Sequence, residues 1–419
     1  MQDRGAWRAD PRRGVLLELY ASACEAVDGR RAVRAALAGA PTTGPVTLIA
    51  VGKAASAMTL GALDVLGSRV ERGLVISRAG HLDAELGAWP VLERLEGDHP
   101  VPGAASLAAG EALLRFAAAT PPATRVLVLV SGGASSLVEA LPAAVTPEDL
   151  RRVNEWGLGA GIDIHELNAI RRRLSRLKDG RLAAALSHTD AEALLISDVP
   201  GDDPAVIGSG LVCALAKAPR PRVPPWLADL LERARDLPKG ATLRARVVAT
   251  LDDALAAAER AADQGGYSAR RLAPAASGDA SGAASRFAHE LALATCDLLV
   301  WGGETNVHLP PRPGRGGRNQ HFALEAARLI AGHDDLVVLA AGTDGTDGNS
   351  QDAGAIVDGT TLARGAAESL DASEALAAAD SGSFLEATGD LLHTGPTGTN
   401  VGDIVLGLRC PPDAPAGGG

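Results

Sequence analysis

The chain has 419 residues, a length that predicts two domains rather than one. Its 46% hydrophobic and 22% charged residues are typical of globular proteins and argue against wholesale disorder. The formal net charge of −11 argues against a nucleic-acid partner, because such binding depends on clustered Lys and Arg. An aromatic content of 3% also leaves few side chains that could stack on bases.

The first residues lack the apolar core of a signal peptide. No apolar run approaches the roughly 18 residues that a membrane-spanning helix needs, so we expect no membrane partner. The four cysteines lie far apart and form no Cys-X-X-Cys pair, which predicts a reduced, cytoplasmic protein without a structural zinc site. The sequence does not decide between a monomer and a homodimer.

Short apolar runs alternate with longer stretches of helical period, a pattern typical of parallel α/β folds. In the first half, strands are predicted over 46–51, 73–77, 125–130 and 193–197, and helices over 14–38, 104–119, 148–158 and 166–186. In the second half, strands are predicted over 246–249, 297–301 and 336–341, and helices over 252–264 and 280–295. The segment 217–226 is the best linker candidate, because its prolines prevent regular structure.

Glycine or polar turns follow five of the predicted strands. They are Val51-Gly52, Val130-Ser131-Gly132-Gly133, Ser197-Asp198, Trp301-Gly302-Gly303-Glu304 and Ala341-Gly342. Ligands of open α/β sheets bind outside the carboxyl ends of the strands. A single glycine there could simply form a tight turn, but five such turns favour a ligand site.

The loop Ser131–Ser136 joins a strand to a helix and is rich in small residues. Its backbone N–H groups and the helix dipole could bind a phosphate or a carboxylate, although an ordinary turn is the alternative. The loop matches neither the Walker A pattern nor GxGxxG. Lys53 lies at the strand-to-helix turn after Gly52, where its ammonium could reach an anion. The alternative is a solvated lysine in the first helical turn, which the helix dipole mildly disfavours, so the position favours a functional role.

Two further groups of charged residues are candidates for the site. Arg171 belongs to a basic run on a predicted helix that also contains Asn168. Such runs are usually solvated, but Arg171 could turn inward and hold a substrate carboxylate through its forked guanidinium. Asp198 ends a strand and could act as a general base or as a Mg²⁺ ligand, whereas Asp202 and Asp203 could belong to an ordinary acidic turn.

Three more loops lie in the second half of the chain. Gly314–Gln320 is glycine-rich and carries two arginines, and His393–Asn400 is rich in Gly and Thr. Gly342–Gly348 has the Asp spacing of an EF-hand but lacks the glutamate at the twelfth position, so it is not a calcium loop. The sequence contains no GxSxG motif, which argues against a serine hydrolase.

Taken together, these segments resemble the bacterial and archaeal glycerate 2-kinases, the family with a C-terminal MOFRL domain. The resemblance extends from about residue 15 to 410. Ala134, Asp179 and Leu211 depart from the family pattern, and Ala134 is expected to narrow an anion site. The motifs that carry the resemblance are Val51-Gly52-Lys53-Ala54, Gly97–Pro102, Ser131-Gly132-Gly133, Asn168 with Arg171, Ser197–Asp203, Gly302–Thr305, Gly316–Gln320, Asp344–Gly348 and Thr394–Val401.

The resemblance implies an α/β fold, with a Rossmann-like three-layer N-terminal domain over 1–240, a smaller α/β MOFRL domain over 241–412, and a disordered tail over 413–419. It implies phosphorylation of D-glycerate at the 2-hydroxyl to give 2-phosphoglycerate and ADP, with ATP and Mg²⁺. Members are also often labelled hydroxypyruvate reductases. An NAD(P)H-dependent reductase is therefore the alternative, and the absence of a dinucleotide fingerprint argues against it.

The resemblance also implies roles for particular residues. Lys53 and Arg318 are expected to act on the charge of the transferred phosphoryl group, and Asp198 is expected to be the base or a Mg²⁺ ligand. The other assignments are Gly132, Gly133, Ser135, Ser136, Asn168 and Arg171 for substrate or phosphate; Gly303, Glu304, Asn319, Gly395 and Thr397 for the nucleotide; and Asp198, Asp344 and Asp347 for the metal.

Overall fold

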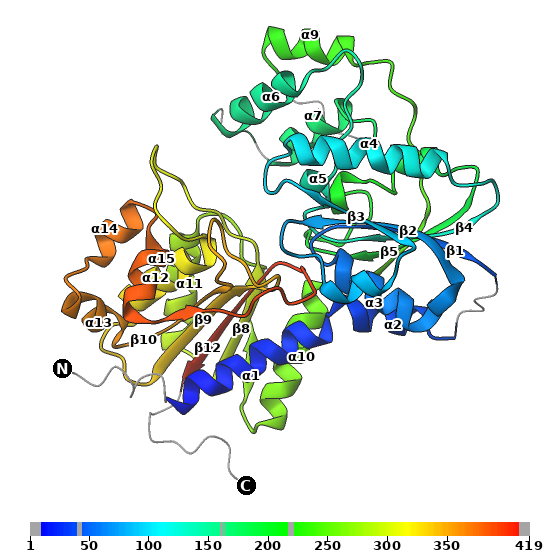
Figure 1. The fold of residues 1–419 in the computed structure, drawn as a ribbon. Helices are drawn as coiled ribbons and strands as arrows, with labels where there is room; N and C mark the ends of the chain where they lie inside the picture. Colours follow the sequence, from blue (N-terminus) through cyan, green and yellow to red (C-terminus); the bar gives the residue numbers. More distant parts are fainter. Residues whose placement is uncertain (1–9, 40–43, 160–161, 163, 217–221, 410–419) are drawn as a thin grey trace. The chain divides into compact units, whose positions relative to one another are not determined.

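The computed structural model describes residues 10–39, 44–159, 162, 164–216 and 222–409, which form two compact units (Figure 1). The first unit contains residues 29–250 and 398–400, and the second contains 10–28, 251–397 and 401–409. No helix in the described part of the chain is long and apolar enough to cross a membrane. The expected disordered tail, 413–419, lies outside the described residues.

This division differs from the expected boundary between residues 240 and 241. The single helix expected over 14–38 is two helices, α1 (Pro11–Ala26) and α2 (Gly29–Leu37), which belong to different units. Helix α1 stays with the second unit because its polar side chains find buried partners there. Arg13 lies 3.1 Å from both Asp358 and Asp390. The Tyr20 hydroxyl donates a 2.7 Å hydrogen bond to the Gly342 carbonyl.

The first unit is built on a six-stranded, fully parallel sheet with the order β3-β2-β1-β4-β5-β6. This is the strand order of dinucleotide-binding folds. The expected α/β fold is therefore confirmed, and residues 244–249 complete the sheet. The strands are β1 (Val46–Val51), β2 (Val70–Arg78), β3 (Leu92–Gly97), β4 (Arg125–Val130), β5 (Asp190–Ile196) and β6 (Arg244–Ala249).

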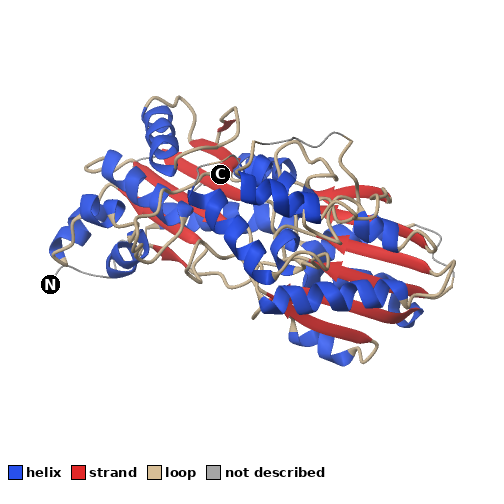
Figure 2. Ribbon diagram, turned by 90° about the horizontal axis from the view of Figure 1, so that it is seen from above, coloured by secondary structure: helices blue, strands red, loops and turns tan. Residues whose placement is uncertain are grey.

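Helices cover both faces of this sheet (Figures 1 and 2). Helix α3 (Ala55–Leu66) packs on one face, and α4 (Ala104–Ala118) and α5 (Ala134–Leu137) pack on the other. The single helix expected over 166–186 is wrong: α7 (Ile164–Arg173) ends before α8 (Arg181–Ala185) begins. Gly180 adopts a left-handed φ of 73°, and a Cβ there would lie 2.1 Å from the Ala241 carbonyl oxygen. The chain therefore turns there.

Helices α6 (Pro147–Gly159), α7 and α9 (Pro225–Arg233) form a helical layer with its own hydrophobic core. Trp156 and Trp226 meet edge to face, with ring centroids 6.4 Å apart. Of the expected linker 217–226, residues 217–221 lie outside the described residues. Pro225 begins α9, a first-turn position that suits proline because its missing N–H has no helical partner.

The second unit contains a mixed sheet with the order β11-β10-β9-β12-β8-β7. Only β7 and β8 are parallel among its pairs of described strands. The strands are β7 (Ala269–Arg271), β8 (Leu298–Gly303), β9 (Leu336–Gly342), β10 (Gly354–Asp358), β11 (Leu391–Leu392) and β12 (Asp403–Arg409).

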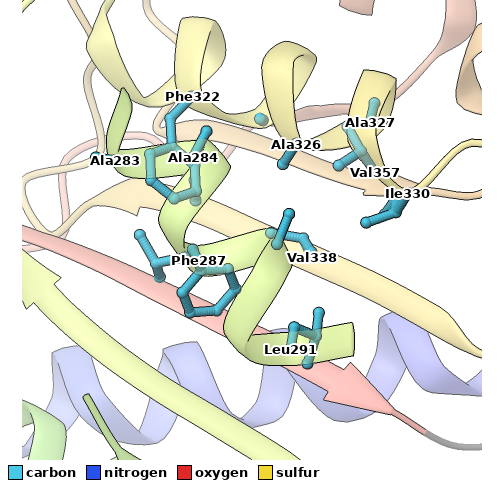
Figure 3. Packing of buried hydrophobic residues seen from close by; sticks show 14 of the residues in the cluster. Ala283, Ala284, Phe287, Leu291, Phe322, Ala326, Ala327, Ile330, Val338 and Val357 are labelled. Atoms are coloured by element: carbon cyan, nitrogen blue, oxygen red, sulfur yellow. The ribbon is translucent and has the colours of Figure 1, made fainter. Parts of the chain in front are cut away.

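The core of the second unit lies between this sheet and two of its helices (Figure 3). Phe287 on α11 stacks on Trp301 with a centroid distance of 6.0 Å, and Phe322 on α12 meets Phe287 edge to face at 5.9 Å. Helices α1 and α10 pack on each other and contact strands β12 and β8. Besides α1, the helices of this unit are α10 (Leu251–Gln264), α11 (Ala280–Ala292), α12 (Arg318–Leu329), α13 (Thr361–Ala367), α14 (Ala372–Ala377) and α15 (Ser381–Thr388).

Candidate active site

Two strand-to-helix loops meet at the point where the first sheet reverses its order. Strands β1 and β4 are neighbours in register, with Val51 opposite Val130. The loops that follow them are joined by a 2.9 Å hydrogen bond from the Lys53 N–H to the Gly132 carbonyl. Ligands of doubly wound folds bind in the crevice at such a reversal. Lys53 and the loop Ser131–Ser136 thus occupy the position at which this fold binds ligands.

Gly132 allows two polar side chains to approach the backbone of this loop. A Cβ at position 132 would lie 1.9 Å from Asn400 Nδ2 and 2.1 Å from Asp198 Oδ2, so a larger residue would displace them. Asn400 Nδ2 in turn donates a 3.3 Å hydrogen bond to Asp198 Oδ2. Asp198 follows β5, and Asn400 belongs to the short segment 398–400 that joins the first unit. The predicted base is therefore oriented by an amide that is distant in sequence.

Gly133 is the N-cap residue of α5 and adopts a left-handed φ of 80°. A Cβ at this position would lie 3.1 Å from Lys53 Cγ and 3.4 Å from His99 Cδ2. The Lys53 stem and the His99 ring therefore pack against the glycine loop. Together with Gly132, this arrangement brings a cation, a carboxylate and an imidazole to the same loop.

The loop Ser131–Ser136 has fewer backbone N–H groups that could bind an anion than the sequence led us to expect. The N–H groups of Ala134, Ser136 and Leu137 donate to carbonyls of Ser131 and Gly133. The hydroxyl of Ser136 also donates to Gly133, and that of Ser135 lies 2.7 Å from the Ser209 hydroxyl. The two serine side chains thus hold the loop in shape. An anion here would meet the N–H groups of Gly132, Gly133 and Ser135.

The departures from the family pattern lie away from the loop surface. The side chains of Ala134 and Leu211 are fully buried in the hydrophobic core of the first unit. The Ala134 methyl packs toward Gly208, where a Cβ would lie 3.3 Å from it. Asp179 has a left-handed φ of 56°, a conformation that the family's usual glycine adopts freely. The methyl of Ala134 therefore fills the core and does not narrow an anion site.

Arg171 and Asn168 lie together on α7, as expected. Arg171 Nη1 donates to Asn168 Oδ1 over 3.3 Å, and Arg171 Nε donates to Asn154 Oδ1 over 2.8 Å. Burial lowers the pKa of Arg171, and the carboxylate of Glu139 partly offsets this effect. Glu139 is itself fully buried beside Lys178, with which it forms an ion pair.

The second unit contains a second polar group, centred on Arg318. Arg318 begins α12, and its Nε and Nη2 donate to the two carboxylate oxygens of Asp403 over 2.5 and 3.1 Å. Its Nη1 lies 2.8 Å from Glu304. Burial alone would lower the pKa of Arg318, but the carboxylates of Asp403 and Glu304 outweigh that effect and raise it. The guanidinium is thus charged and held at a fixed orientation.

Asp347 caps the same helix. Its Oδ1 accepts from the N–H and the side-chain amide of Asn319, and its Oδ2 accepts from the Gln320 N–H over 2.8 Å. Burial raises the pKa of Asp347 to about 7, although these backbone N–H groups oppose the shift. Asp347 and Asn319 therefore stabilise the start of α12, and their expected roles toward metal and nucleotide are not apparent from these contacts.

The other expected nucleotide and metal residues lie on loops of the second unit. Asp344 Oδ1 accepts from the Thr346 N–H over 2.9 Å. The Thr397 hydroxyl donates to the Thr343 carbonyl. Gly303 has a φ of 155°, and a Cβ there would lie 2.1 Å from the Ala276 carbonyl oxygen. Gly395 adopts a left-handed φ of 68°, with nothing in the described residues near its missing Cβ.

The candidate metal residues do not form a closed site. In the described part of the chain, no group of three or more His, Cys, Asp or Glu side chains is placed to hold a metal ion. Mg²⁺ commonly takes one or two carboxylates together with phosphate oxygens and waters, so a single carboxylate such as Asp198 suits it.

Sequence reasoning did not assign Asn154, Asn400 or Asp403 to the site. Asn400 lies within a motif that carries the resemblance, but the sequence gives no sign that its side chain contacts Asp198. Asp403 follows that motif by two residues and begins strand β12, with no local pattern that distinguishes it from other aspartates. Asn154 lies on an amphipathic helix and gave no signal at all.

Comparison with known proteins gives two family matches along the chain. Residues 15–221 match a domain of unknown function, DUF4147, and residues 297–403 match the MOFRL family. The chain is 32% identical to the D-glycerate 2-kinase of Thermotoga maritima, over 94% of this chain and 97% of that protein. A crystal structure of glycerate kinase from the same organism covers 96% of this chain and 100% of its own, with 31% identity and a TM-score of 0.80.

A relative from Agrobacterium vitis bears a provisional name, hydroxypyruvate reductase, and is 35% identical over 96% of this chain and 95% of its own. The two names occur at similar levels of identity, but the solved structure carries the kinase name. The resemblance inferred from the sequence motifs is thereby confirmed. The chain belongs to the family of glycerate 2-kinases that combine a DUF4147 domain with a MOFRL domain.

Proposed function

We propose that this protein transfers the γ-phosphoryl group of ATP to the 2-hydroxyl of D-glycerate and releases 2-phosphoglycerate and ADP. The observation that carries the proposal is the grouping of Lys53, Asp198 and a glycine loop at the strand reversal of the first sheet. Phosphoryl transfer requires positioned cations and a base rather than covalent chemistry, and this grouping contains both.

Asp198 acts as the base in this proposal. The 2-hydroxyl gives its proton to the Asp198 carboxylate, and its oxygen bonds to the γ-phosphorus as the bond from that phosphorus to ADP breaks. Asn400 donates to Oδ2 of Asp198, which helps to orient the carboxylate that accepts the proton. Lys53 and Arg318 stabilise the charge on the transferred group.

Glu304, Gly395 and Thr397, together with Arg318, are the residues that would contact the nucleotide. With Asp198 as the base, Asp344 is the carboxylate that would hold Mg²⁺, together with phosphate oxygens and waters. When bound, this ion neutralises phosphate charge. Asp347 is left out of this set, because both of its oxygens already accept hydrogen bonds at the start of α12.

A reductase would need a dinucleotide site after β1. Dinucleotide-binding folds place G-x-G-x-x-G at this turn, so that the backbone can approach the pyrophosphate closely. Here the turn reads Gly52-Lys53-Ala54-Ala55-Ser56-Ala57, which keeps only the first glycine. The kinase reaction is therefore the function that the geometry supports best.

³¹P NMR of the purified protein with Mg-ATP and D-glycerate tests the proposal. We expect 2-phosphoglycerate and ADP to form as ATP is consumed, and turnover to fall by about 10³-fold in Lys53→Ala and in Arg318→Ala. Lys239→Ala and Arg235→Ala, at exposed positions, are the matched controls. Oxidation of NAD(P)H with hydroxypyruvate, without consumption of ATP, would refute the proposal in favour of the reductase.

A further inference from the structure

Three unsatisfied hydrogen-bond donors lie in the helical layer of the first unit. Six buried side-chain polar atoms lack a hydrogen-bond partner among the described residues, and three of them are Asn154 Nδ2, Arg172 Nε and Arg172 Nη1. Asn154 is only 3% exposed and Arg172 only 6%. A buried donor without a partner costs about 1–3 kcal/mol, so native proteins rarely keep one without a reason. A bound ligand would supply the missing acceptor.

One of these donors, the amide of Asn154, lies beside a cation, the guanidinium of Arg171. Its guanidinium is held by two amide oxygens, Asn154 Oδ1 at 2.8 Å and Asn168 Oδ1 at 3.3 Å. Amide oxygens fix its orientation but do not neutralise its charge, and within the described residues Arg171 forms no ion pair. The buried guanidinium of Arg13 is different, because two carboxylates lie within 3.1 Å of it. Arg171 is therefore a positioned cation without a direct counter-ion.

The amide of Asn154 completes a set of donors. Because its oxygen accepts from Arg171, its Nδ2 is the group left to bind something else, next to the remaining N–H groups of the guanidinium. These groups donate and do not accept, so they suit an anion. Both residues lie on helices, and the hydrophobic core shared by α6, α7 and α9 (Figure 1) holds those helices in place.

Arg172 does not belong to this set. The carboxylates of Asp179 and Asp203 act on its charge and partly offset the lowering of its pKa by burial. Its position, one residue along α7, also directs it about 100° away from Arg171 around the helix. The anion site therefore contains one guanidinium and one amide. This set matches the single charge of a planar carboxylate better than the several charges of a triphosphate.

We propose that Asn154 and Arg171 form the subsite for the carboxylate of the acceptor, with Asn168 positioning the guanidinium. This inference rests on the proposed kinase function, which supplies a 2-hydroxy acid as the acceptor. It makes Asn154 a specificity-determining residue. Uncharged polyols then bind poorly, because they leave the Arg171 charge and the Asn154 amide unsatisfied.

The test compares D-glycerate with its uncharged amide, D-glyceramide, as acceptors. Asn154→Asp keeps an oxygen for Arg171 but replaces the Nδ2 donor with a second carboxylate oxygen, which also neutralises the guanidinium. Arg171→Lys keeps the charge but loses the fork. In both variants we expect the ratio of kcat/KM for glycerate to that for glyceramide to fall by roughly 10- to 100-fold, while KM for ATP stays unchanged.

Arg152→Met is the matched control, because Arg152 lies on the same helix and stacks on Trp226 at 4.0 Å from the ring centroid. We expect it to leave the acceptor ratio as in the wild type. If Asn154→Asp and Arg171→Lys slow both acceptors equally, the two residues have only a structural role and the subsite proposal is wrong. If the wild type transfers no phosphoryl group to glycerate, the kinase proposal fails instead. Calorimetric titration with glycerate and glyceramide then tests the subsite without turnover. Tighter binding of glycerate than of glyceramide by the wild type, lost in Asn154→Asp, supports the subsite, and an equal preference in both proteins contradicts it.

Discussion

The placement of α1 in the second unit predicts where one substitution will act. Arg13 on α1 faces two aspartates of that unit, Asp358 and Asp390, and its Nη2 donates to the Ile356 carbonyl over 2.7 Å. Arg364 pairs with the same two aspartates, which gives a neutral network of two arginines and two carboxylates. Arg13→Met keeps a stem of similar length and removes the charge.

The structure allows the cost of this substitution to be worked out. Asp390 is fully buried and Asp358 is 5% exposed, so the excess negative charge that remains is poorly solvated. Breaking a buried pair in this way costs about 3–5 kcal/mol. That is a large part of the roughly 5–15 kcal/mol by which proteins are stable. Arg30→Met is the control, since Arg30 pairs with Asp64 and Glu85 at the surface and its loss costs at most about 1 kcal/mol.

Urea unfolding and hydrogen exchange measure both effects. Arg13→Met should lower the unfolding midpoint and reduce amide protection in β10 and α13, whereas Arg30→Met should change little. Adding Asp390→Asn to Arg13→Met restores neutrality and should recover part of the loss. Equal destabilisation by the two methionine variants, or a loss of protection confined to the parallel sheet, would refute the reasoning.

Three further predictions concern single groups. Asp403→Asn should lower kcat by about 10²-fold with little change in stability, because Arg318 loses the carboxylate that orients it; steady-state kinetics measure this. Since burial raises the pKa of Asp347 to about 7, the folded state keeps a proton that the unfolded state releases between about pH 4 and 7, and the free energy of unfolding falls as pH rises through that window. Urea unfolding should therefore show that the free energy of unfolding of Asp347→Asn, relative to that of the wild type, is higher at pH 8 than at pH 5, by up to about 4 kcal/mol. Gly132→Ala should abolish turnover while the circular dichroism spectrum stays native, because its methyl would displace Asp198.

Much of the candidate site in the first unit could be predicted, because the sequence signals for its residues are local. The expected strands at 46–51 and 125–130 are β1 and β4, and the turns after them contain Lys53 and Gly132. In a parallel sheet, the residues that follow neighbouring strands are brought together by the fold itself. The position of these residues directly after a strand is therefore enough to place them at the same edge of the sheet. Asp198, which follows β5, is predicted in the same way.

The rest of the site could not be predicted, because its signals are not local. Nothing near Asn154 indicates that its amide meets Arg171, 17 positions later, since that contact depends on how α6 packs against α7. The helices expected over 14–38 and 166–186 were too long for a related reason. Helical periodicity continues across a break, and only tertiary partners, such as those of Arg13 and Gly180, decide where the chain turns.

The segment after Thr397 contributes residues to both units. Residues 398–400 belong to the first unit, where Asn400 donates to Asp198. Three residues later, Asp403 belongs to the second unit and holds Arg318. One short stretch of chain therefore orients both the proposed base and the proposed phosphoryl-stabilising cation.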